Sequence, residues 1–328
     1  MKNSFKKDLV SINIVNWNGM KYLGRCLQSI NNQTYPDIEV IIVDNGSEDG
    51  SLEFLKSGFP GIRLLENKNN IGFSCAHNQA ICNSNGEFVI PLNFDMILTP
   101  DFVKEMVRAA NTDENVGMVS GKLFKKFNAQ TPSILDTTGI IMNNMFPGDR
   151  GEGREDCGEF EKYEFIFGAS GAAPLYRRTM LEDIRLNDEY FDEDFFIYVE
   201  DVDLAWRAQL CGWKCIYTPY AIALHERGAT RRDDSGIKKG YYTIGFRNRY
   251  LSIFKNSLVS NIIIHIGRIV LRETYFYMTH IKNGNFYILK VPFSTISILP
   301  KMIKKRRIIQ KKRRVSGEYM EKFFFKEK

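Results

Sequence analysis

Leu9-Val-Ser-Ile-Asn-Ile-Val15 is a short run rich in β-branched residues, and the chain repeats this composition at Ile38-Glu-Val-Ile-Ile-Val43. Such runs predict buried β-strands because branched side chains pack well on a pleated surface. Residues 20–30, which lie between them, have the apolar spacing of an amphipathic helix. A strand, a helix and a second strand in this order predict two parallel strands in one sheet, joined by the helix.

The same alternation continues through the first half of the chain. Predicted helices at residues 51–57, 73–84 and 100–111 alternate with predicted strands at residues 62–66, 87–92 and 116–119. This order predicts an α/β fold with a Rossmann-like, mostly parallel central sheet and helices on both of its faces.

The second half of the chain is less regular. Residues 125–165 are rich in Gly and Asn, and they predict a long loop or a small hairpin. Beyond about residue 238 the pattern becomes aromatic and helical. We therefore expect an α/β domain over residues 1–255 and a helical, aromatic and basic region over residues 256–328.

Polar side chains directly follow three of the predicted strands. They are Asn16, Asp44 and the pair Asn93 and Asp95. Ligands of open α/β sheets bind at the carboxyl ends of the strands, so these residues indicate where a site would lie. Asp44 could accept a hydrogen bond from a nucleobase N–H or a ribose hydroxyl, or it could cap the helix that begins near Ser47. Asp95 could coordinate Mg²⁺ or Mn²⁺, although a single Asp after a strand is commonly a turn residue.

A cluster of acids opens the helix that is predicted at residues 202–211. Glu200, Asp201 and Asp203 follow a run of aromatic residues. Carboxylates beside buried aromatic surface are costly unless they are paired, so a cluster of this kind commonly binds a metal or acts as a base. Acids are also favourable at a helix N-terminus, where they need have no function. His225 ends the next apolar segment and could complete a metal site.

The composition is that of a globular chain of 328 residues, of which 44% are hydrophobic and 26% are charged. The six cysteines form no metal-binding pattern, because Cys211 and Cys215 lack a second Cys or His pair. Reduced thiols in a cytoplasmic protein are the simpler interpretation. We expect no secretory signal and no membrane-spanning helix, since the longest apolar segments, at residues 258–271 and 286–299, are interrupted by charged residues.

Basic residues are concentrated near the C-terminus. Residues 301–314 contain nine Lys and Arg and no acid, which exceeds the net charge of +6, so the rest of the chain is net acidic. Residues 262–278 combine apolar and aromatic side chains, and the two segments together predict binding to an anionic membrane surface. A solvated tail after a packed helix is the alternative. Nucleic acid is not expected as a partner, because no nucleic-acid-binding module accompanies the basic residues.

Two arginines, Arg247 and Arg249, lie in the aromatic segment that precedes this region. A guanidinium group is suited to bidentate contacts with phosphate. Either arginine could therefore contact a diphosphate or an acceptor phosphate, and a surface helix without such a role is the alternative.

The motifs together resemble the family 2 glycosyltransferases of GT-A fold, particularly their rhamnosyltransferase-like branch. The resemblance covers roughly residues 8–250, and the order and spacing of the matching stretches make it specific. These stretches are Ile14-Val-Asn-Trp-Asn-Gly19, Val43-Asp-Asn-Gly-Ser-Glu-Asp-Gly-Ser51, Asn69-Asn-Ile-Gly-Phe73 with Asn78, Leu92-Asn-Phe-Asp95, Ser170-Gly-Ala172, Tyr198-Val-Glu-Asp-Val-Asp203 with Arg207, and His225.

The resemblance implies roles for individual residues. Asp95 and His225 would bind a divalent metal ion, Mg²⁺ or Mn²⁺. Asp201 is similar to the base of inverting enzymes, while Glu200 and Asp203 would orient the acceptor and brace the loop. The residues implied in binding a nucleotide-sugar donor are Asn16, Asp44, Asn70, Gly72, Asn78, Asn93 and Asp95.

One stretch departs from the family pattern. The metal-binding Asp-x-Asp of the family usually begins with Asp, whereas this chain has Asn93-Phe94-Asp95. Loss of the first carboxylate should weaken metal binding, so the resemblance determines neither the metal nor a strict requirement for it.

The resemblance implies an inverting glycosyltransferase of cell-surface polysaccharide biosynthesis, with rhamnose among the candidate sugars. It would use a nucleoside-diphosphate sugar and a glycan or lipid-linked acceptor at the inner face of the cell membrane. A sugar nucleotidyltransferase is one alternative, although residues 16–20 lack the Gly-rich, basic loop that this chemistry favours. A non-catalytic nucleotide-sugar-binding module is the other, and it would have no turnover for Asp201→Asn to remove.

Overall fold

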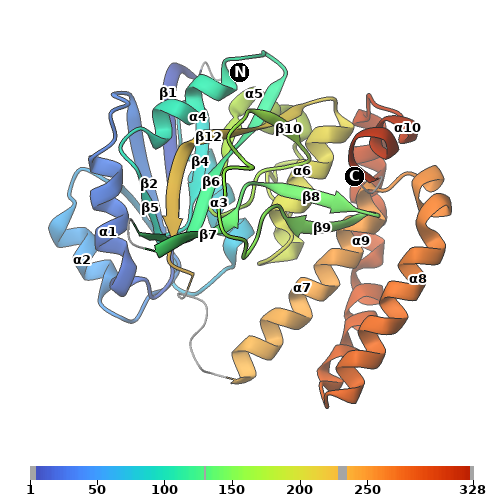
Figure 1. The fold of residues 1–328 in the computed structure, drawn as a ribbon. Helices are drawn as coiled ribbons and strands as arrows, with labels where there is room; N and C mark the ends of the chain where they lie inside the picture. Colours follow the sequence, from blue (N-terminus) through green and yellow to red (C-terminus); the bar gives the residue numbers. More distant parts are fainter. Residues whose placement is uncertain (1–4, 129–130, 228–234, 326–328) are drawn as a thin grey trace.

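The computed structural model describes residues 5–128, 131–227 and 235–325. A central sheet has helices packed on its faces, and three long helices from the C-terminal part of the chain stand together at one side of it (Figure 1). This arrangement has the α/β sheet and the helical C-terminal region that the sequence predicts.

The first half of the chain forms the parallel part of the sheet, from β1 (Lys6–Asn16), α1 (Met20–Asn31), β2 (Ile38–Asp44), α2 (Ser51–Gly58), β3 (Arg63–Glu66), α3 (Phe73–Cys82) and β4 (Gly86–Leu92). These strands pair in the order β3-β2-β1-β4, and all of the pairs are parallel. Ser11 and Asn13 on β1 are as fully buried as the apolar Val10, Ile12 and Ile14, because both faces of the sheet are covered.

The second half extends the same sheet with β5 (Met96–Leu98), β6 (Val116–Asn128), β7 (Thr131–Thr137), β10 (Glu164–Ile166), β11 (Leu175–Arg177) and β12 (Lys214–His225). The antiparallel strand β11 lies between β4 and β6, and β12 runs parallel to β6. The strands β1, β2, β3, β4, β6 and β12 therefore all point the same way, which confirms the mostly parallel sheet. Short antiparallel partners complete the sheet, with β5 and β10 beside β12 and β7 beside β6.

The strand β12 is longer than its sequence pattern indicates. That pattern predicts two segments, at residues 214–217 and 221–225, whereas the structure joins them in one strand. The register of β12 against β6 shifts between Tyr217 and Ile222. Pro219 lies in this interval and has no backbone N–H to donate, which accounts for the interrupted pattern.

The hairpin expected within residues 125–165 is formed by β8 (Ile140–Asn143) and β9 (Phe146–Asp149). The alternative of one long loop is wrong, because β7 and β10 belong to the main sheet. Ile140, Met145 and Phe146 are buried in the core, and this burial orders a segment whose Gly and Asn content favours turns.

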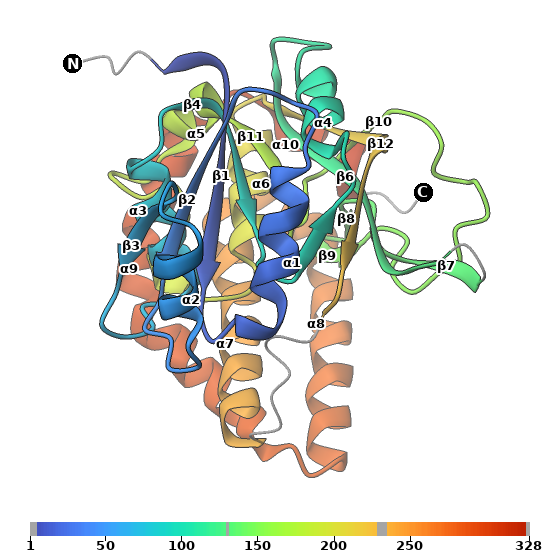
Figure 2. The same ribbon diagram turned by 90° about the vertical axis from the view of Figure 1, so that its left-hand side faces the viewer.

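The helices that follow in the second half are α4 (Phe102–Ala110), α5 (Arg178–Ile184), η1 (Glu193–Phe195), α6 (Glu200–Leu210), α7 (Ser235–Asn256), α8 (Val259–Lys282), η2 (Phe286–Leu289), α9 (Lys290–Lys312), α10 (Gly317–Met320) and the π-helical η3 (Glu321–Phe325). Figure 2 shows α7, α8 and α9 extending together beyond the sheet. The chain then returns to the core, where the ring of Phe325 lies 5.6 Å from that of Trp206 on α6. A domain boundary at residue 255 stays a prediction.

Two expectations about the C-terminal region are corrected. Within the described residues, Phe286–Lys312 is long and apolar enough to cross a membrane by length and composition, so the expectation of no such segment was wrong. The helix continues through Pro300 and beyond the apolar run. The basic residues that follow lie largely on α9 and not on a free tail, since Lys305 is only 8% exposed and pairs with Glu189 and Asp192.

Candidate active site

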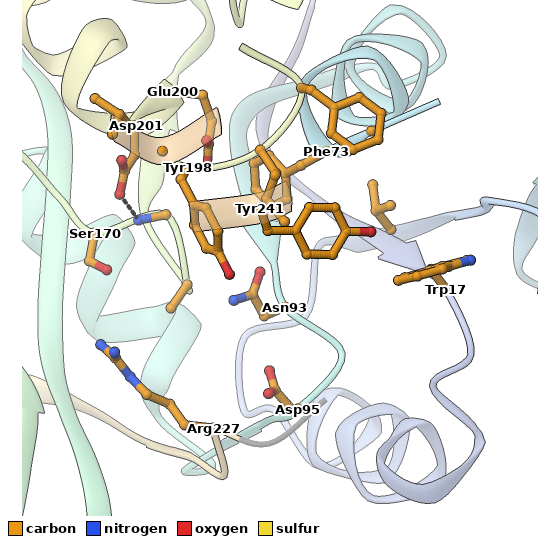
Figure 3. Close-up of a pocket in the computed structure, with 18 of the residues that line it drawn as sticks. Trp17, Phe73, Asn93, Asp95, Ser170, Tyr198, Glu200, Asp201, Arg227 and Tyr241 are labelled. Carbon is orange, nitrogen blue, oxygen red and sulfur yellow. Dashed lines mark hydrogen bonds between the residues drawn. The ribbon is translucent and has the colours of Figure 1, made fainter. Parts of the chain in front are cut away.

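A cavity of about 630 Å³ lies where the carboxyl ends of the parallel strands meet the beginning of α6 and the middle of α7 (Figure 3). Residues after β1, β2 and β4 line it together with the end of β12, which is where ligands of such sheets bind. The aromatic side chains around it come from several elements and include Trp17, Phe73, Tyr198, Tyr241 and Phe246.

Asp95 and His225, the predicted metal ligands, lie together in this cavity. The pairing of β5 with the end of β12 places His225 opposite Met96, so the sheet itself brings the two side chains to one point. Asp95 Oδ1 is 3.3 Å from His225 Nε2. The other ring nitrogen of His225, Nδ1, is 2.8 Å from Oδ2 of the fully buried Asp136.

A guanidinium group also contacts the carboxylate that holds this imidazole. Arg227 Nε lies 2.5 Å from Asp136 Oδ1. Burial opposes ionisation of Asp136, but the hydrogen bond from His225 and the charges of His225 and Arg227 prevail and lower its pKa. Burial likewise lowers the pKa of His225, yet its contacts to Asp136 and Asp95 outweigh burial and raise that pKa to about 9.

These side chains fit a divalent metal ion. A carboxylate oxygen and an imidazole nitrogen suit Mn²⁺, while Mg²⁺ needs few protein ligands when phosphates supply the rest. Asp136 holds the Nδ1 side of His225 and leaves Nε2 directed at Asp95, as is usual for a metal-binding histidine. No group of three or more His, Cys, Asp or Glu in the described part of the chain could hold a metal, so diphosphate and water oxygens would supply the remaining ligands.

Glu200 and Asp201 begin α6, and both line the cavity. Asp201 Oδ2 accepts a hydrogen bond from the backbone N–H of Gly171, drawn as a dashed line in Figure 3, and Oδ1 accepts one from Val202, each at 2.8 Å. Burial raises the pKa of both carboxyls, and the charge of Asp201 helps to raise that of Glu200 to about 8. Near neutral pH Glu200 therefore keeps its proton, while the two backbone N–H donors favour the ionised form of Asp201, in which it can accept one.

Asn70 and Gly72, predicted to bind the donor, line the same cavity as Asn93. Asn70 Oδ1 accepts hydrogen bonds from Asn45 Nδ2 and from the Gly72 backbone N–H, both at 2.9 Å. Gly72 has φ of +89°, and a Cβ there would lie 2.5 Å from the ring of Phe196. Glycine is thus required at position 72 by its backbone conformation and by the packing of this ring.

Asn16 and Asp44, also predicted to bind the donor, lie outside the cavity lining. Both are at most 1% exposed, and Asn16 Nδ2 donates to Asp44 Oδ1 at 2.8 Å. Asp44 Oδ2 accepts a hydrogen bond from the backbone N–H of Ser47 at 3.0 Å, which closes a turn. The alternative role as a helix cap was wrong, because α2 begins at Ser51 and its N-cap is Gly50. A contact of either residue with a ligand stays a prediction.

Asn78 and Asp203 likewise lie outside the lining, where they brace the segment before α6. The Asn78 amide donates to the backbone oxygen of Phe191 and accepts from its N–H, both at 2.9 Å. Asp203 is fully buried and forms ion pairs with Arg207 Nε at 3.0 Å and Lys255 Nζ at 2.9 Å. Asp203 therefore has contacts suited to bracing the loop, not to touching an acceptor.

The structure places Arg249 in the cavity lining and Arg247 outside it. Residues two apart on a helix point in different directions, so only one of them can face the site. Arg247 Nη2 donates to the backbone oxygen of Asp194 at 2.6 Å. The guanidinium of Arg249 contacts both carboxylate oxygens of Glu273, each at 2.8 Å.

Sequence reasoning missed Asp136 and Arg227. Asp136 lies in the segment expected to be a loop or hairpin, and its partner His225 is 89 positions away, so no local spacing could indicate the pair. Arg227 follows His225 by two positions, and residues at that spacing in an extended chain point to the same side. That spacing was the available signal.

Residues 11–185 match the model of the family described as "Glycosyl transferase family 2". The chain belongs to this family. It is 26% identical over 246 residues to the N-acetylglucosaminyl-diphospho-decaprenol L-rhamnosyltransferase of Mycobacterium tuberculosis, an alignment that covers 69% of this chain and 79% of that protein. The predicted family and enzyme class are confirmed, which removes the nucleotidyltransferase and the non-catalytic module as alternatives.

Two solved structures show that this family 2 glycosyltransferase has the predicted GT-A fold. The mannosyltransferase PcManGT from Pyrobaculum calidifontis, in complex with GDP-Man and Mn²⁺, matches with a TM-score of 0.54 at 15% identity, covering 95% of this chain and 77% of that one. GalNAc-T7 with UDP, GalNAc and Mn²⁺ matches with a TM-score of 0.58 at 14% identity, covering 78% and 48%. At such identities the likeness concerns the fold alone.

Proposed function

We propose that this glycosyltransferase transfers a sugar from a nucleoside-diphosphate donor to a glycan or lipid-linked acceptor, with inversion at the anomeric carbon, in cell-surface polysaccharide biosynthesis. The observation that supports this most is that Asp201, Asp95 and His225 line one cavity. Rhamnose is the sugar to test first, because the Mycobacterium tuberculosis relative is named for L-rhamnosyl transfer.

Asp201 acts as the base in this proposal. Its two oxygens accept backbone hydrogen bonds from Gly171 and Val202, which fix the carboxylate while lone pairs remain for an acceptor hydroxyl. The acceptor oxygen bonds to the anomeric carbon as the bond to the diphosphate breaks, and its proton passes to Asp201. A carboxylate is a weak base for an alcohol, so this transfer is late, and most of the acceleration comes from positioning and electrostatic stabilisation.

Asp95 and His225 would hold the divalent metal ion, with Asp136 orienting the imidazole. When bound, Mg²⁺ or Mn²⁺ neutralises negative charge on the leaving diphosphate. Asn93 stands where the family usually has a second acid, so more of the metal affinity would depend on the diphosphate oxygens. Both structural neighbours were solved with Mn²⁺, which supports a divalent ion.

We place the enzyme in the cytoplasm, peripherally bound at the inner face of the cell membrane. Most of the exposed large hydrophobic side chains in the described part of the chain lie on α8, η2 and α9, and soluble monomers rarely expose so many together. A lipid-linked acceptor would be reached from such a surface. The apolar surface consists of Val259, Ile263, Ile264, Ile266, Val270, Leu271, Tyr275, Met278, Ile281, Phe286, Leu289, Phe293, Ile296 and Ile303.

The basic residues contribute less to this proposed membrane contact than the sequence suggests, because several of them bind the protein itself. Lys301 pairs with Asp194 at 2.9 Å, and Arg314 pairs with Asp183 at 2.7 Å. The apolar surface would therefore supply most of the affinity, with electrostatic attraction from the exposed bases. Those bases include Lys304, Arg307 and Lys311.

Binding of nucleotide sugars tests the donor. The thermal stability of the protein is measured with dTDP-, UDP- and GDP-sugars, with and without Mn²⁺ or Mg²⁺, since a ligand that binds the folded state raises its stability. We expect one nucleotide class to stabilise the protein more strongly when the ion is present. Stabilisation by no member of the panel, together with no transfer to lipid-linked acceptors, would contradict the proposal.

Asp201→Asn tests the base. The substitution keeps the size of the side chain and removes its capacity to accept a proton, so turnover should fall by about 100-fold or more. Donor-dependent thermal stabilisation should stay close to that of the wild type, because Asp201 contacts the acceptor and not the nucleotide. Near-normal turnover by Asp201→Asn would exclude Asp201 as the base.

A further inference from the structure

The loop directly before the catalytic acids has an unusual backbone. Phe196, Tyr198 and Val199 all have positive φ, at 61°, 68° and 70°, although none of them is glycine. Side chains disfavour this region, most of all a β-branched residue such as Val199. Val199 is also the N-cap of α6, so its conformation sets the direction in which Glu200 and Asp201 leave the loop. A backbone of this kind persists only where the surrounding structure holds it.

A single buried side chain on α7 contacts most of this loop. Asn248 Nδ2 lies 2.7 Å from the backbone oxygen of Phe195, and 2.9 Å from those of both Ile197 and Tyr198. Asn248 itself is fully buried, so its amide nitrogen relies on these carbonyl groups for its hydrogen bonds. Arg247 donates to Asn248 Oδ1 at 2.9 Å, which orients the amide with its nitrogen toward the loop.

The start of α3 also holds this loop, through hydrogen bonds to the backbone oxygen of Phe196. The carbonyl of Phe196, which Asn248 does not reach, accepts hydrogen bonds from the backbone N–H groups of Phe73 at 2.6 Å and Ser74 at 3.3 Å. These groups lie at the start of α3, directly after Gly72. The backbone oxygens of residues 195–198 therefore each have a donor, and Asn248 serves three of the four.

We propose that Asn248 is a positioning residue, which holds the loop of residues 195–199 in its strained conformation and so places Glu200 and Asp201 in the cavity. The inference rests on the proposed function only in that the placed carboxylate is the base. Asn248 touches neither acid, and its effect passes through the backbone. Arg247, one of the two arginines considered from the sequence as a phosphate ligand, here donates to Asn248 and to the backbone oxygen of Asp194.

The chemistry of the amide explains why this position needs Asn. Three carbonyl oxygens converge on one NH₂ group, which has two hydrogens and no charge. Asp at position 248 would have the same shape but would place a carboxylate against those oxygens. Ala would remove this shared donor and leave the Phe195 oxygen with the backbone N–H of Ile197 at 2.6 Å, and the loop could then relax toward ordinary φ values at the expense of the position of Asp201.

Amide hydrogen exchange of the full-length protein measures the loop directly, without any substrate. In Asn248→Ala and Asn248→Asp, we expect faster exchange in peptides covering residues 195–203. The peptide containing Gly171 should also exchange faster, because its N–H donates to Asp201 Oδ2. Asn261→Ala is the matched control, since Asn261 is 1% exposed and its amide donates to the Gly317 oxygen at 3.0 Å. That variant should change exchange near residues 317–321 only.

Turnover separates positioning from general stability. With the donor found in the nucleotide-sugar panel, both Asn248 variants should lose about 100-fold in kcat, the effect expected of a small misplacement. Their KM for the donor should stay near that of the wild type, and Asn261→Ala should keep its kcat. If Asn248→Ala does not fold, the isosteric Asn248→Asp provides the same test.

Two results would overturn this proposal. One is unchanged exchange at residues 195–203 and Gly171 in the folded Asn248 variants. The other is faster exchange there with kcat reduced no more than in Asn261→Ala, which would make Asn248 a packing residue only. A wild-type protein that transfers no sugar would instead overturn the proposed function, and exchange at Gly171 would still decide whether Asn248 places Asp201.

Discussion

Glu200 and Asp201 are adjacent carboxyls with different hydrogen-bond partners. Burial disfavours ionisation of both, and once Asp201 is ionised its charge helps to keep Glu200 protonated. Backbone N–H groups of Gly171 and Val202 stabilise the ionised form of Asp201. One acid can thus act as a base while its neighbour remains neutral, which is the division of roles that proton transfer in a partly buried site requires.

Glu200→Gln should change how stability depends on pH. The pKa of Glu200 is about 8 in the folded protein and near 4.5 in the unfolded chain. Between these values only the folded state keeps the proton, so the free energy of unfolding falls as pH rises from 4.5 to 8. Gln does not titrate, so the variant avoids this loss. Its free energy of unfolding should rise relative to that of the wild type over this pH window, by on the order of a few kcal/mol. Urea unfolding at several pH values measures this, and parallel curves would contradict it.

Asp136→Asn should weaken metal binding, although Asp136 is not itself a proposed metal ligand. Asp136 accepts the hydrogen bond from Nδ1 of His225 that leaves Nε2 directed at Asp95. Loss of such an orienting carboxylate typically costs about 10–100-fold in metal affinity. Isothermal titration of Mn²⁺ in the presence of a nucleoside diphosphate measures the change.

Asp156→Asn is a suitable control for this measurement, because Asp156 is ion-paired with Lys122 at 2.8 Å. It removes a carboxylate and its ion pair from the same part of the chain without touching His225. Equal Mn²⁺ affinity of Asp136→Asn and Asp156→Asn would show that Asp136 does not orient His225.

The same residues show how much of the site can be predicted from sequence. Polar residues at strand ends indicated Asn93 and Asp95 correctly as cavity residues, because parallel strands bring their carboxyl ends to one edge. Asn16 and Asp44 also lie at strand ends, yet they form a hydrogen bond with each other outside the cavity lining. The sequence places a residue at the edge of a sheet, but the direction of its side chain depends on partners far along the chain.

At the scale of elements, the sequence predicted best where each element is stabilised by its own pattern. Strand and helix alternation in the first half gave β1 to β4 in their observed parallel arrangement. Between residues 125 and 165 the pattern predicted a hairpin but not β7 and β10, because these two strands are held by pairing with β6 and β12 and not by local preference. The roles of Asn248 and Lys305 were equally hidden, since both act on the segment before α6 from helices at the other end of the chain.

Lys305 on α9 should be required for stability, although it lies in the basic segment. Its ammonium contacts the fully buried Asp192 at 2.5 Å and Glu189 at 2.8 Å, and Lys255 also pairs with Asp192. Burial opposes ionisation of Asp192, but the charges of Lys255 and Lys305 outweigh it and lower its pKa. Lys305→Met would leave this carboxylate with one cation fewer, at a cost of about 3 kcal/mol.

The neighbouring Lys304 is exposed and provides the control. Lys304→Met should change stability by no more than about 0.5 kcal/mol, as is usual for exposed positions. Urea unfolding compares the two variants at neutral pH, and equal midpoints would mean that Lys305 is not part of the buried network.

The same contacts imply that truncation before Lys301 would unfold part of the molecule. Truncation therefore cannot measure the contribution of the basic residues to membrane binding.

At the scale of the whole molecule, the active-site cavity and the apolar surface of α8, η2 and α9 lie in different parts of the structure and are connected by α7. The cavity lies at the edge of the sheet, and α7 connects it to the region of α8 and α9, since Phe246 lines the cavity and packs on Phe276 of α8 with ring centroids 4.7 Å apart. The apolar surface of α8, η2 and α9 is thus continuous with the helix that borders the active site. Under the proposed function, α7 is the element that would connect a membrane-bound acceptor at this surface with the cavity.

The double variant Leu271→Ser and Phe293→Ser tests this surface. The two side chains are 73% and 76% exposed, so the fold should tolerate the changes. If they enter a bilayer, each contributes about 1.5–3 kcal/mol on burial, and binding to phosphatidylglycerol vesicles should fall by at least about tenfold. Lys304→Gln with Arg307→Gln should weaken binding to these anionic vesicles but not to phosphatidylcholine vesicles, because its effect is electrostatic.

Tyr220→Ser is the matched control, because Tyr220 is 54% exposed and lies on β12, outside α8, η2 and α9. It should bind vesicles as the wild type does. A second copy of the chain is the other candidate to cover this surface. In that case the double variant Leu271→Ser and Phe293→Ser would convert a dimer to a monomer without changing vesicle binding. Sedimentation velocity measures this change in mass. Unchanged binding of the double variant to vesicles would show that the bilayer does not cover this surface, and access of a lipid-linked acceptor would need another route.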